Sequence, residues 1–282
     1  MTFISYAQNF EDVALWRALK LYGPGFYIDI GANHPSIDSV TRSLYERGWR
    51  GVNVEPVQRY HEALCAARPR DVNLCVAVGS KDAGELQFFE SPETGLSTLC
   101  PEMAAQQSAA GICFTPRKVT TRTLVSLCEE HVPQAPAFQF LKIDVEGFEE
   151  QVLQGMDFRR WRPWIVLVES PYHTEPDWES LILAAGYQFA LCDGLNRYYV
   201  AQERIELLVP LALPPNLLDG FVLCPGHSLS HPADKKTFPQ DQYDKALQRA
   251  EAAEAQLEAI YASRLWAFGT MVRSLKSRFS RR

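Results

Sequence analysis

The feature that most constrains the fold is a regular alternation of short apolar runs and longer helix-like stretches between residues 26 and 200. The runs are rich in β-branched and aromatic residues and predict strands at residues 26–30, 51–55, 72–78, 86–89, 138–145 and 164–169. The stretches between them predict helices at residues 36–47, 57–67, 124–131, 149–156 and 178–185. This order is typical of βαβ units and predicts an α/β fold with a mostly parallel sheet.

The last two predicted strands are joined differently. Residues 187–192 and 198–202 flank Asp193-Gly194-Leu195-Asn196, a short polar loop suited to a hairpin. Because the strands of a hairpin are antiparallel, we expect an antiparallel pair at the edge of the sheet.

The composition changes after residue 203. Six prolines between residues 204 and 240 predict irregular structure that ends in a linker at 231–240. Alanine, leucine, glutamate and glutamine then recur at helical spacing. We therefore expect one domain at residues 1–230, followed after the linker by a helical tail at 241–282.

The end of this tail is both basic and apolar. Residues 264–282 contain six basic residues and no acidic one. Large apolar side chains are interleaved with them, at Leu265, Trp266, Phe268, Met271, Val272, Leu275 and Phe279. The pattern indicates an amphipathic helix for an anionic membrane surface or an acidic partner. The alternative is a solvated terminal helix that binds nothing.

Charge and cysteine content exclude several classes of function. Outside residues 264–282 there are 22 basic and 34 acidic residues, a net charge of −12, so the body should repel nucleic acid. The seven cysteines form no C-x-x-C pair, which favours reduced thiols over a structural zinc site. The first residues lack a signal-peptide pattern, and no apolar run reaches about 20 residues. We expect a cytoplasmic protein, which the tail would bring to the inner face of the membrane.

Polar residues at the ends of the predicted strands are the candidate ligand-binding groups. In an open parallel sheet, ligands bind outside the carboxyl ends of the strands. The first strand runs into Asp29-Ile30-Gly31-Ala32-Asn33, where Gly31 allows a tight turn and the helix expected from Ser36 offers its amino end. The alternative for this string is an ordinary turn between a strand and a helix.

Glu55 ends the next strand, 24 residues after Gly31. An offset of about 20 residues is typical of an acid that binds ribose hydroxyls. The sequence after Gly31 lacks the G-x-G-x-x-G phosphate cradle, so a nicotinamide cofactor is disfavoured. An adenosyl cofactor that carries an amino acid fits better, and the alternative is that Glu55 is a solvated acid.

Two acids and a glycine follow the central strand, in Leu141-Lys142-Ile143-Asp144-Val145-Glu146-Gly147. Strand alternation predicts that Asp144 and Glu146 share one face, unless Glu146 instead caps the helix expected near Phe148. Glu169 ends the neighbouring strand, and His173 lies in the loop after it. A lone loop histidine is more often without a function than catalytic.

Five strings in this order resemble the FkbM-type methyltransferases over about residues 5–203. They are Ser5-Tyr6-Ala7-Gln8-Asn9-Phe10-Glu11-Asp12, Asp29-Ile30-Gly31-Ala32-Asn33, Val54-Glu55-Pro56, Gly95-Leu96-Ser97-Thr98-Leu99 and Leu141 to Gly147. The resemblance implies a Rossmann-like class I methyltransferase fold and S-adenosyl-L-methionine as cofactor. The string Asp193 to Tyr199 resembles a sub-branch found beside bacterial surface-polysaccharide enzymes, which implies polysaccharide biosynthesis and a sugar hydroxyl as acceptor.

The resemblance also implies roles for single residues. Asp29, Gly31 and Asn33 would contact the methionine portion of the cofactor, and Glu55 would contact its ribose. Tyr6 and Gln8 would close the pocket from the amino-terminal segment. One departure is Pro35, which stands where many relatives have a second glycine and puts the backbone contacts after Asn33 in doubt.

The predicted reaction is O-methylation of a hydroxyl in a glycan or small-molecule acceptor. A hydroxyl is a poor nucleophile until it is deprotonated, and the candidate bases are Asp144, Glu146, Glu169 and His173. Alternatively, Asp144 and Glu169 would hold Mg²⁺ or Mn²⁺, because two converging carboxylates without a cation would repel each other. Two other functions remain open, N-methylation and a non-catalytic carbohydrate-binding or scaffold subunit on the same fold.

Overall fold

The computed structural model describes residues 2–91, 94–133, 138–171 and 175–230. The predicted linker at 231–240 and the predicted tail at 241–282 therefore lie outside the described residues. All named helices and strands belong to one compact unit, Met1–His227. Within the described part of the chain, no helix combines the length and apolarity needed to cross a membrane.

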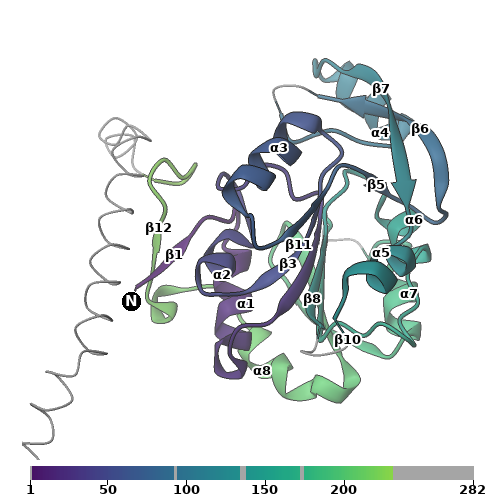
Figure 1. Ribbon diagram of the computed structural model, residues 1–282. Helices are drawn as coiled ribbons and strands as arrows, with labels where there is room; N and C mark the ends of the chain where they lie inside the picture. The colour runs from purple at the N-terminus through teal and green to yellow at the C-terminus, as the bar shows by residue number, and fades with distance from the viewer. Residues whose placement is uncertain (1, 92–93, 134–137, 172–174, 231–282) are drawn as a thin grey trace, which may run out of the picture. The chain divides into compact units, whose positions relative to one another are not determined.

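The centre of this unit is a seven-stranded sheet in the order β10-β11-β9-β8-β2-β3-β4 (Figure 1). Its parallel strands are β2 (Phe26–Ile30), β3 (Arg50–Val54), β4 (Val72–Leu74), β8 (Phe138–Ile143) and β9 (Ile165–Glu169). The hairpin β10 (Tyr187–Cys192) and β11 (Asn196–Ala201) lies at one edge, and β11 is antiparallel to both of its neighbours. The predicted α/β class, mostly parallel with an antiparallel edge hairpin, is confirmed.

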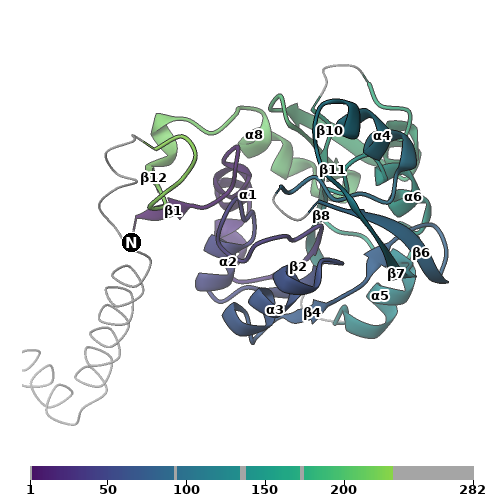
Figure 2. The same ribbon diagram turned by 90° about the horizontal axis from the view of Figure 1, so that it is seen from above.

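Helices cover both faces of the sheet (Figures 1 and 2). One apolar core packs β2, β3, β8 and β9 against α5 (Leu124–His131), α6 (Glu149–Gln154) and α7 (Glu179–Ala184). A second core, on alternate strand residues, packs β2, β8, β9 and β11 against α1 (Glu11–Leu19), α2 (Arg42–Glu46) and α8 (Leu208–Leu211). All six residues of β8 are buried, as its continuous apolar sequence predicts.

The predicted helix at 36–47 is wrong over its first half. Helix α2 begins only at Arg42, and Ser36 caps nothing. The buried guanidinium of Arg68 donates hydrogen bonds to Pro35 O, Ser39 Oγ and Thr41 Oγ1, each 2.7 Å long. These bonds hold residues 35–41 as a loop, so a charge that is distant in sequence overrides local helix propensity.

A second, three-stranded sheet was predicted only in part. It is formed by β5 (Ala77–Val78), β7 (Thr115–Arg122) and β6 (Ala83–Glu90), with α4 (Pro101–Ala109) between β6 and β7. The strand predicted at 86–89 lies within β6 and the strand predicted at 72–78 is divided into β4 and β5, whereas β7 and α4 were not predicted. The proline-rich region is not wholly irregular, because it contains α8 and β12 (Phe221–Leu223), which pairs with β1 (Phe3–Ser5). The remaining helix, α3 (Gln58–Ala67), agrees with its prediction within one residue. Most of β7 is exposed and polar, so its sequence carries no strand periodicity.

The turn after β2 touches the loop after β8. Gly31 has a φ of +74°, and a Cβ on it would lie 1.8 Å from the carbonyl oxygen of Asp144. Its amide donates to Val54 O over 3.0 Å, which ties the turn to β3 as well. Only glycine fits this contact, so Gly31 fixes the mutual approach of three strand ends.

We expect Gly31→Ala to lower the free energy of unfolding by more than about 2 kcal/mol, because left-handed backbone alone costs an L-residue about 1–2 kcal/mol and the Asp144 carbonyl must also move. Thermal and urea unfolding measure the loss. Gly84→Ala is the matched control, since a Cβ on Gly84 meets nothing within 4 Å. Equal stability of the two variants would contradict the assignment.

Candidate active site

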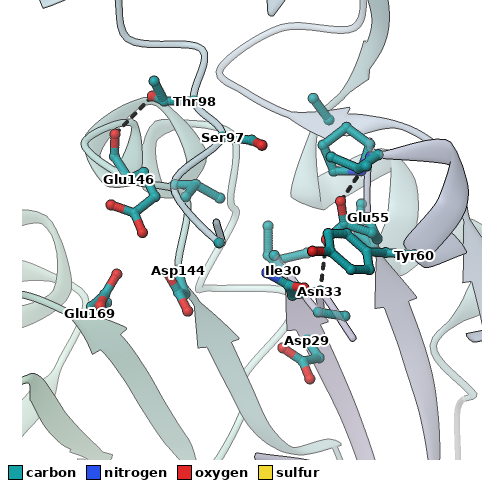
Figure 3. A pocket seen from close by; sticks show the side chains of 18 of the residues that line it. Asp29, Ile30, Asn33, Glu55, Tyr60, Ser97, Thr98, Asp144, Glu146 and Glu169 are labelled. Carbon is teal, nitrogen blue, oxygen red and sulfur yellow. Dashed lines mark hydrogen bonds between the residues drawn. The ribbon is translucent and has the colours of Figure 1, made fainter. Parts of the chain in front are cut away.

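A cavity of about 470 Å³ lies at the carboxyl ends of β2, β3, β8 and β9. Figure 3 shows the predicted polar residues of all four strand ends around it, with Asn33 and Glu55 on one side and Asp144, Glu146 and Glu169 on the other. The loop 94–99 lines the cavity between β6 and α4, and Gln8 reaches it from the amino-terminal segment. Apolar residues also line the cavity, with Val54 and Val57 at and after the end of β3, Val76 after β4, Val78 in β5 and Phe88 in β6.

The carboxylate of Glu55 is held by the backbone at the end of β3. Its Oε2 accepts a hydrogen bond from Asn33 N and its Oε1 accepts one from Val57 N, both 2.8 Å long. Burial raises the pKa of Glu55 to about 7, against the lowering effect of these two bonds. A carboxylate has about four lone-pair sites, so Glu55 keeps capacity for two hydroxyl donors.

Lys142 connects the turn after β2 to the loop after β8. Its Nζ donates to Gly31 O over 2.9 Å and forms ion pairs with Asp144 Oδ2 at 3.0 Å and Asp29 Oδ1 at 3.3 Å. Burial opposes the charge, but Asp144 and Asp29 raise the pKa of Lys142 above its ordinary value. The sequence interpretation gave Lys142 no role, although an ammonium within an otherwise apolar strand signals a buried partner.

Asp29 is buried beside this ammonium. Its Oδ2 accepts a hydrogen bond of 2.9 Å from Thr41 Oγ1. Its Oδ1 faces Lys142 but has no hydrogen-bond partner among the described residues. Asp29, Gly31 and Asn33 all line the cavity, so the structure brings the predicted cofactor-binding string to the predicted place.

Three carboxyl groups converge on the other side of the cavity. One oxygen from each of Asp144, Glu146 and Glu169 lies within 4.8 Å of the others. Strand alternation does not bring them together, because β8 ends at Ile143 and Glu146 has a left-handed backbone with a φ of 56°. Glu146 is also not a helix cap, because the N-cap residue of α6 is Phe148 and no side chain caps this helix.

These three groups differ in charge. Burial would raise the pKa of Asp144, but Lys142 lowers it below its ordinary value. Burial and the neighbouring Asp144 raise the pKa of Glu169 far above its ordinary value. Burial, Asp144 and Glu149 raise the pKa of Glu146 to about 8. At neutral pH Asp144 is therefore charged, Glu169 keeps a proton, and Glu146 is mostly protonated with a smaller ionised fraction.

Of the two amino-terminal residues predicted to close the pocket, only one lines the cavity. Gln8 lines the cavity, whereas Tyr6 is buried outside the lining, with its hydroxyl 3.4 Å from Glu46 Oε1. The segment is anchored to the edge hairpin, since Glu11 Oε1 accepts a hydrogen bond of 2.7 Å from Asn196 Nδ2. His173 lies outside the described residues.

The chain is similar to known methyltransferases. Residues 29–189 match the family described as the methyltransferase FkbM domain. A methyltransferase FkbM from Methylobacillus flagellatus KT is 16% identical with a TM-score of 0.38, and the similarity covers 63% of this chain and 43% of that one. A precorrin-6y C5,15-methyltransferase from Geobacter metallireducens GS-15 is 15% identical with a TM-score of 0.36, over 67% of this chain and 76% of that one.

The chain thus spans less than half the length of the first of these structures. No curated protein matches the sequence. The family match covers more than half of the 282 residues and includes the carboxyl end of β2 and all of β3, β8 and β9, whose ends form the cavity. The chain belongs to the FkbM methyltransferase family.

Proposed function

We propose that this methyltransferase uses S-adenosyl-L-methionine to methylate a sugar hydroxyl of a cell-surface glycan or glycoconjugate. The observation that carries the proposal is the convergence of two sets of strand-end acids on one cavity, Glu55 with the Asp29–Asn33 turn on one side and three carboxyl groups on the other. The first set suits an adenosyl cofactor, and the second suits an acceptor that must lose a proton.

The chain's residues fit the cofactor. Glu55 keeps two acceptor sites for the ribose hydroxyls, and the apolar residues after β3 and β4 suit an adenine ring. Asp29 Oδ1 faces Lys142 but accepts no hydrogen bond from the described residues, so together with Gly31 and Asn33 it suits the ammonium of the methionine portion. About 470 Å³ lies within the usual range for small-molecule sites. When bound, S-adenosylmethionine supplies an electrophilic methyl group.

Glu146 is our choice as the general base. A base works best when its pKa is near the operating pH, and the pKa of Glu146 is about 8. Asp144 is committed to Lys142, and Glu169 already carries a proton that it shares with Asp144 in a hydrogen bond. Base catalysis of this kind contributes about 10²–10⁴-fold. His173 is the alternative base.

The structure weakens the argument for a metal ion at Asp144 and Glu169. The case for Mg²⁺ or Mn²⁺ was the repulsion between Asp144 and Glu169, which Lys142 and the retained proton of Glu169 relieve. Carboxylate oxygens remain suitable ligands for these cations, and Glu146 would complete a set of three. We favour catalysis by the carboxyl groups themselves.

The acceptor and the location belong to the same proposal. Carboxyl groups that donate and accept hydrogen bonds suit the several hydroxyls of a sugar. N-methylation would use the same cofactor side with a different acceptor, and a scaffold subunit would bind glycan without turnover. The basic sequence at 264–282 suits contact with the anionic inner face of the membrane or with a glycan-assembly partner.

Incubation with labelled S-adenosylmethionine and a panel of sugar-containing acceptors tests this function. Mass spectrometry should find the label on an oxygen of the acceptor. Label on nitrogen would support N-methylation, and acceptor binding without any label would support the scaffold subunit.

We expect Glu55→Ala to weaken S-adenosylmethionine binding by roughly 10- to 150-fold, because hydrogen bonds to a charged group contribute about 1.5–3 kcal/mol. Isothermal titration calorimetry measures the change. Glu62→Ala, on the exposed part of α3, is the control. Unchanged affinity in a folded Glu55→Ala protein would contradict the ribose assignment.

The affinity for S-adenosylmethionine should fall as the pH falls below about 7. Ribose hydroxyls donate to the ionised form of Glu55, whose pKa in the free protein is about 7, so binding at lower pH must displace a proton. The affinity should drop by up to about tenfold per pH unit below this pKa. In Glu55→Gln this pH dependence should disappear, and only the part that comes from titration of the ligand itself should remain. Parallel curves of affinity against pH for the two proteins would refute the prediction.

Exhaustive chelation should leave turnover unchanged, because Lys142 already balances the charge of Asp144. Initial rates before and after removal of divalent cations measure the effect, and cofactor affinity measured in parallel serves as the control. A loss of turnover that Mg²⁺ or Mn²⁺ restores, together with the same loss in Asp144→Asn, would instead establish the metal site.

A further inference from the structure

The backbone at Glu146 adopts a conformation that its side chain disfavours. Glu146 has a φ of 56° and Gly147 follows with a φ of 93°, so two consecutive residues are left-handed. Such a conformation costs a residue with a side chain free energy, and it persists only where neighbouring groups hold it. The groups that hold it here therefore control where the Glu146 carboxylate lies.

One of these groups is the hydroxyl of Thr98. Thr98 is 1% exposed, and its Oγ1 lies 2.8 Å from Glu146 O (Figure 3). The amide of Cys100 donates a hydrogen bond of 2.8 Å to Thr98 Oγ1. A hydroxyl has a single hydrogen, so that hydrogen is directed to the carbonyl of Glu146.

Thr98 is itself fixed. Its amide and carbonyl form a pair of hydrogen bonds of 3.0 and 2.9 Å with the carbonyl and amide of Phe89, in β6. The hydroxyl thus links the three-stranded sheet to the loop after β8. Its anchor does not depend on Glu146.

The other contacts hold the flanking residues. The Glu149 carboxylate accepts hydrogen bonds from Gly147 N and Val145 N, at 3.0 and 3.3 Å. On the outer side, a Cβ on Gly147 would lie 3.1 Å from Cε of Met103, in α4. Thr98 alone, among these groups, bonds to the peptide carbonyl of Glu146.

We propose that Thr98 is a positioning residue, whose hydroxyl holds Glu146 in the left-handed conformation that brings its carboxylate to those of Asp144 and Glu169. The proposal rests on the proposed function, in which Glu146 is the base. A catalytic group displaced by about 1 Å can lose about 10²-fold in rate. The Thr98 hydroxyl therefore affects turnover through Glu146 and does not itself contact the acceptor.

A double-mutant cycle between Thr98 and Glu146 tests this role. Thr98→Val keeps the shape but removes the hydroxyl, and it should lower kcat by about 10- to 100-fold while KM for S-adenosylmethionine changes by less than about threefold. Thr98→Ser, which keeps the hydroxyl, should retain most of kcat. In a Glu146→Gln background, Thr98→Val should cause no further loss, because both changes remove the same contribution.

The control is Thr123→Val, which removes a hydroxyl that accepts the Ser126 amide at the start of α5. It should lower stability and leave kcat unchanged. Equal losses from Thr98→Val with and without Glu146, or a loss in Thr98→Ser as large as in Thr98→Val, would overturn the proposal and leave Thr98 a structural residue. If Thr98→Val does not fold, Thr98→Ala enters the same cycle.

A crystal structure of the Thr98 variant separates this proposal from the proposed function. We expect Glu146 to leave the left-handed region and its carboxylate to move away from that of Asp144. A wild-type protein that transfers no methyl group would refute the function, and the structure would still decide the role of Thr98. Glu146 unmoved in that structure would overturn the positioning role.

Discussion

The arrangement of the site depends on one buried ammonium. Lys142 Nζ bonds to the carbonyl of Gly31 and pairs with Asp144 and Asp29, so it joins the two loops that leave the middle of the sheet. Without this charge, no cation would balance the carboxylates of Asp29 and Asp144 that flank it. Lys142 thereby keeps the turn after β2 against the loop after β8 and lets acids accumulate around the cavity.

Close packing at Gly31 and directional bonds at Thr98 refine the position that Lys142 sets. The absence of a Cβ on Gly31 allows the Asp144 carbonyl to approach. Two residues further on, the Thr98 hydroxyl bonds to the carbonyl of Glu146. The loop after β8 is therefore fixed from both sides, by the turn after β2 and by the small sheet. A catalytic group on a loop needs such support, because loop backbone has no ladder of its own.

The strands that carry the site could be predicted from the sequence, whereas the conformations of two loops could not. Apolar runs and terminal acids predicted β2, β3, β8 and β9 and brought Glu55, Asp144 and Glu169 to one edge, since the carboxyl ends of parallel strands meet there. The loop at 35–41 was misjudged because its partner, Arg68, is distant in the sequence. The left-handed Glu146 and the bonds of Lys142 were also beyond prediction, because both depend on contacts across strands.

The charges around the cavity indicate which group can receive a proton under the proposed function. Methylation of a hydroxyl releases one proton, and an acid that is already neutral or firmly paired cannot take it. Asp144 and Asp29 share Lys142, and Glu169 keeps its own proton. Glu55 is turned toward two backbone amides on the other side. Among the described acids around the cavity this leaves Glu146, whose conformation is maintained by its neighbours. Its pKa of about 8 leaves an ionised fraction that can take the proton, and this fraction grows as the pH rises.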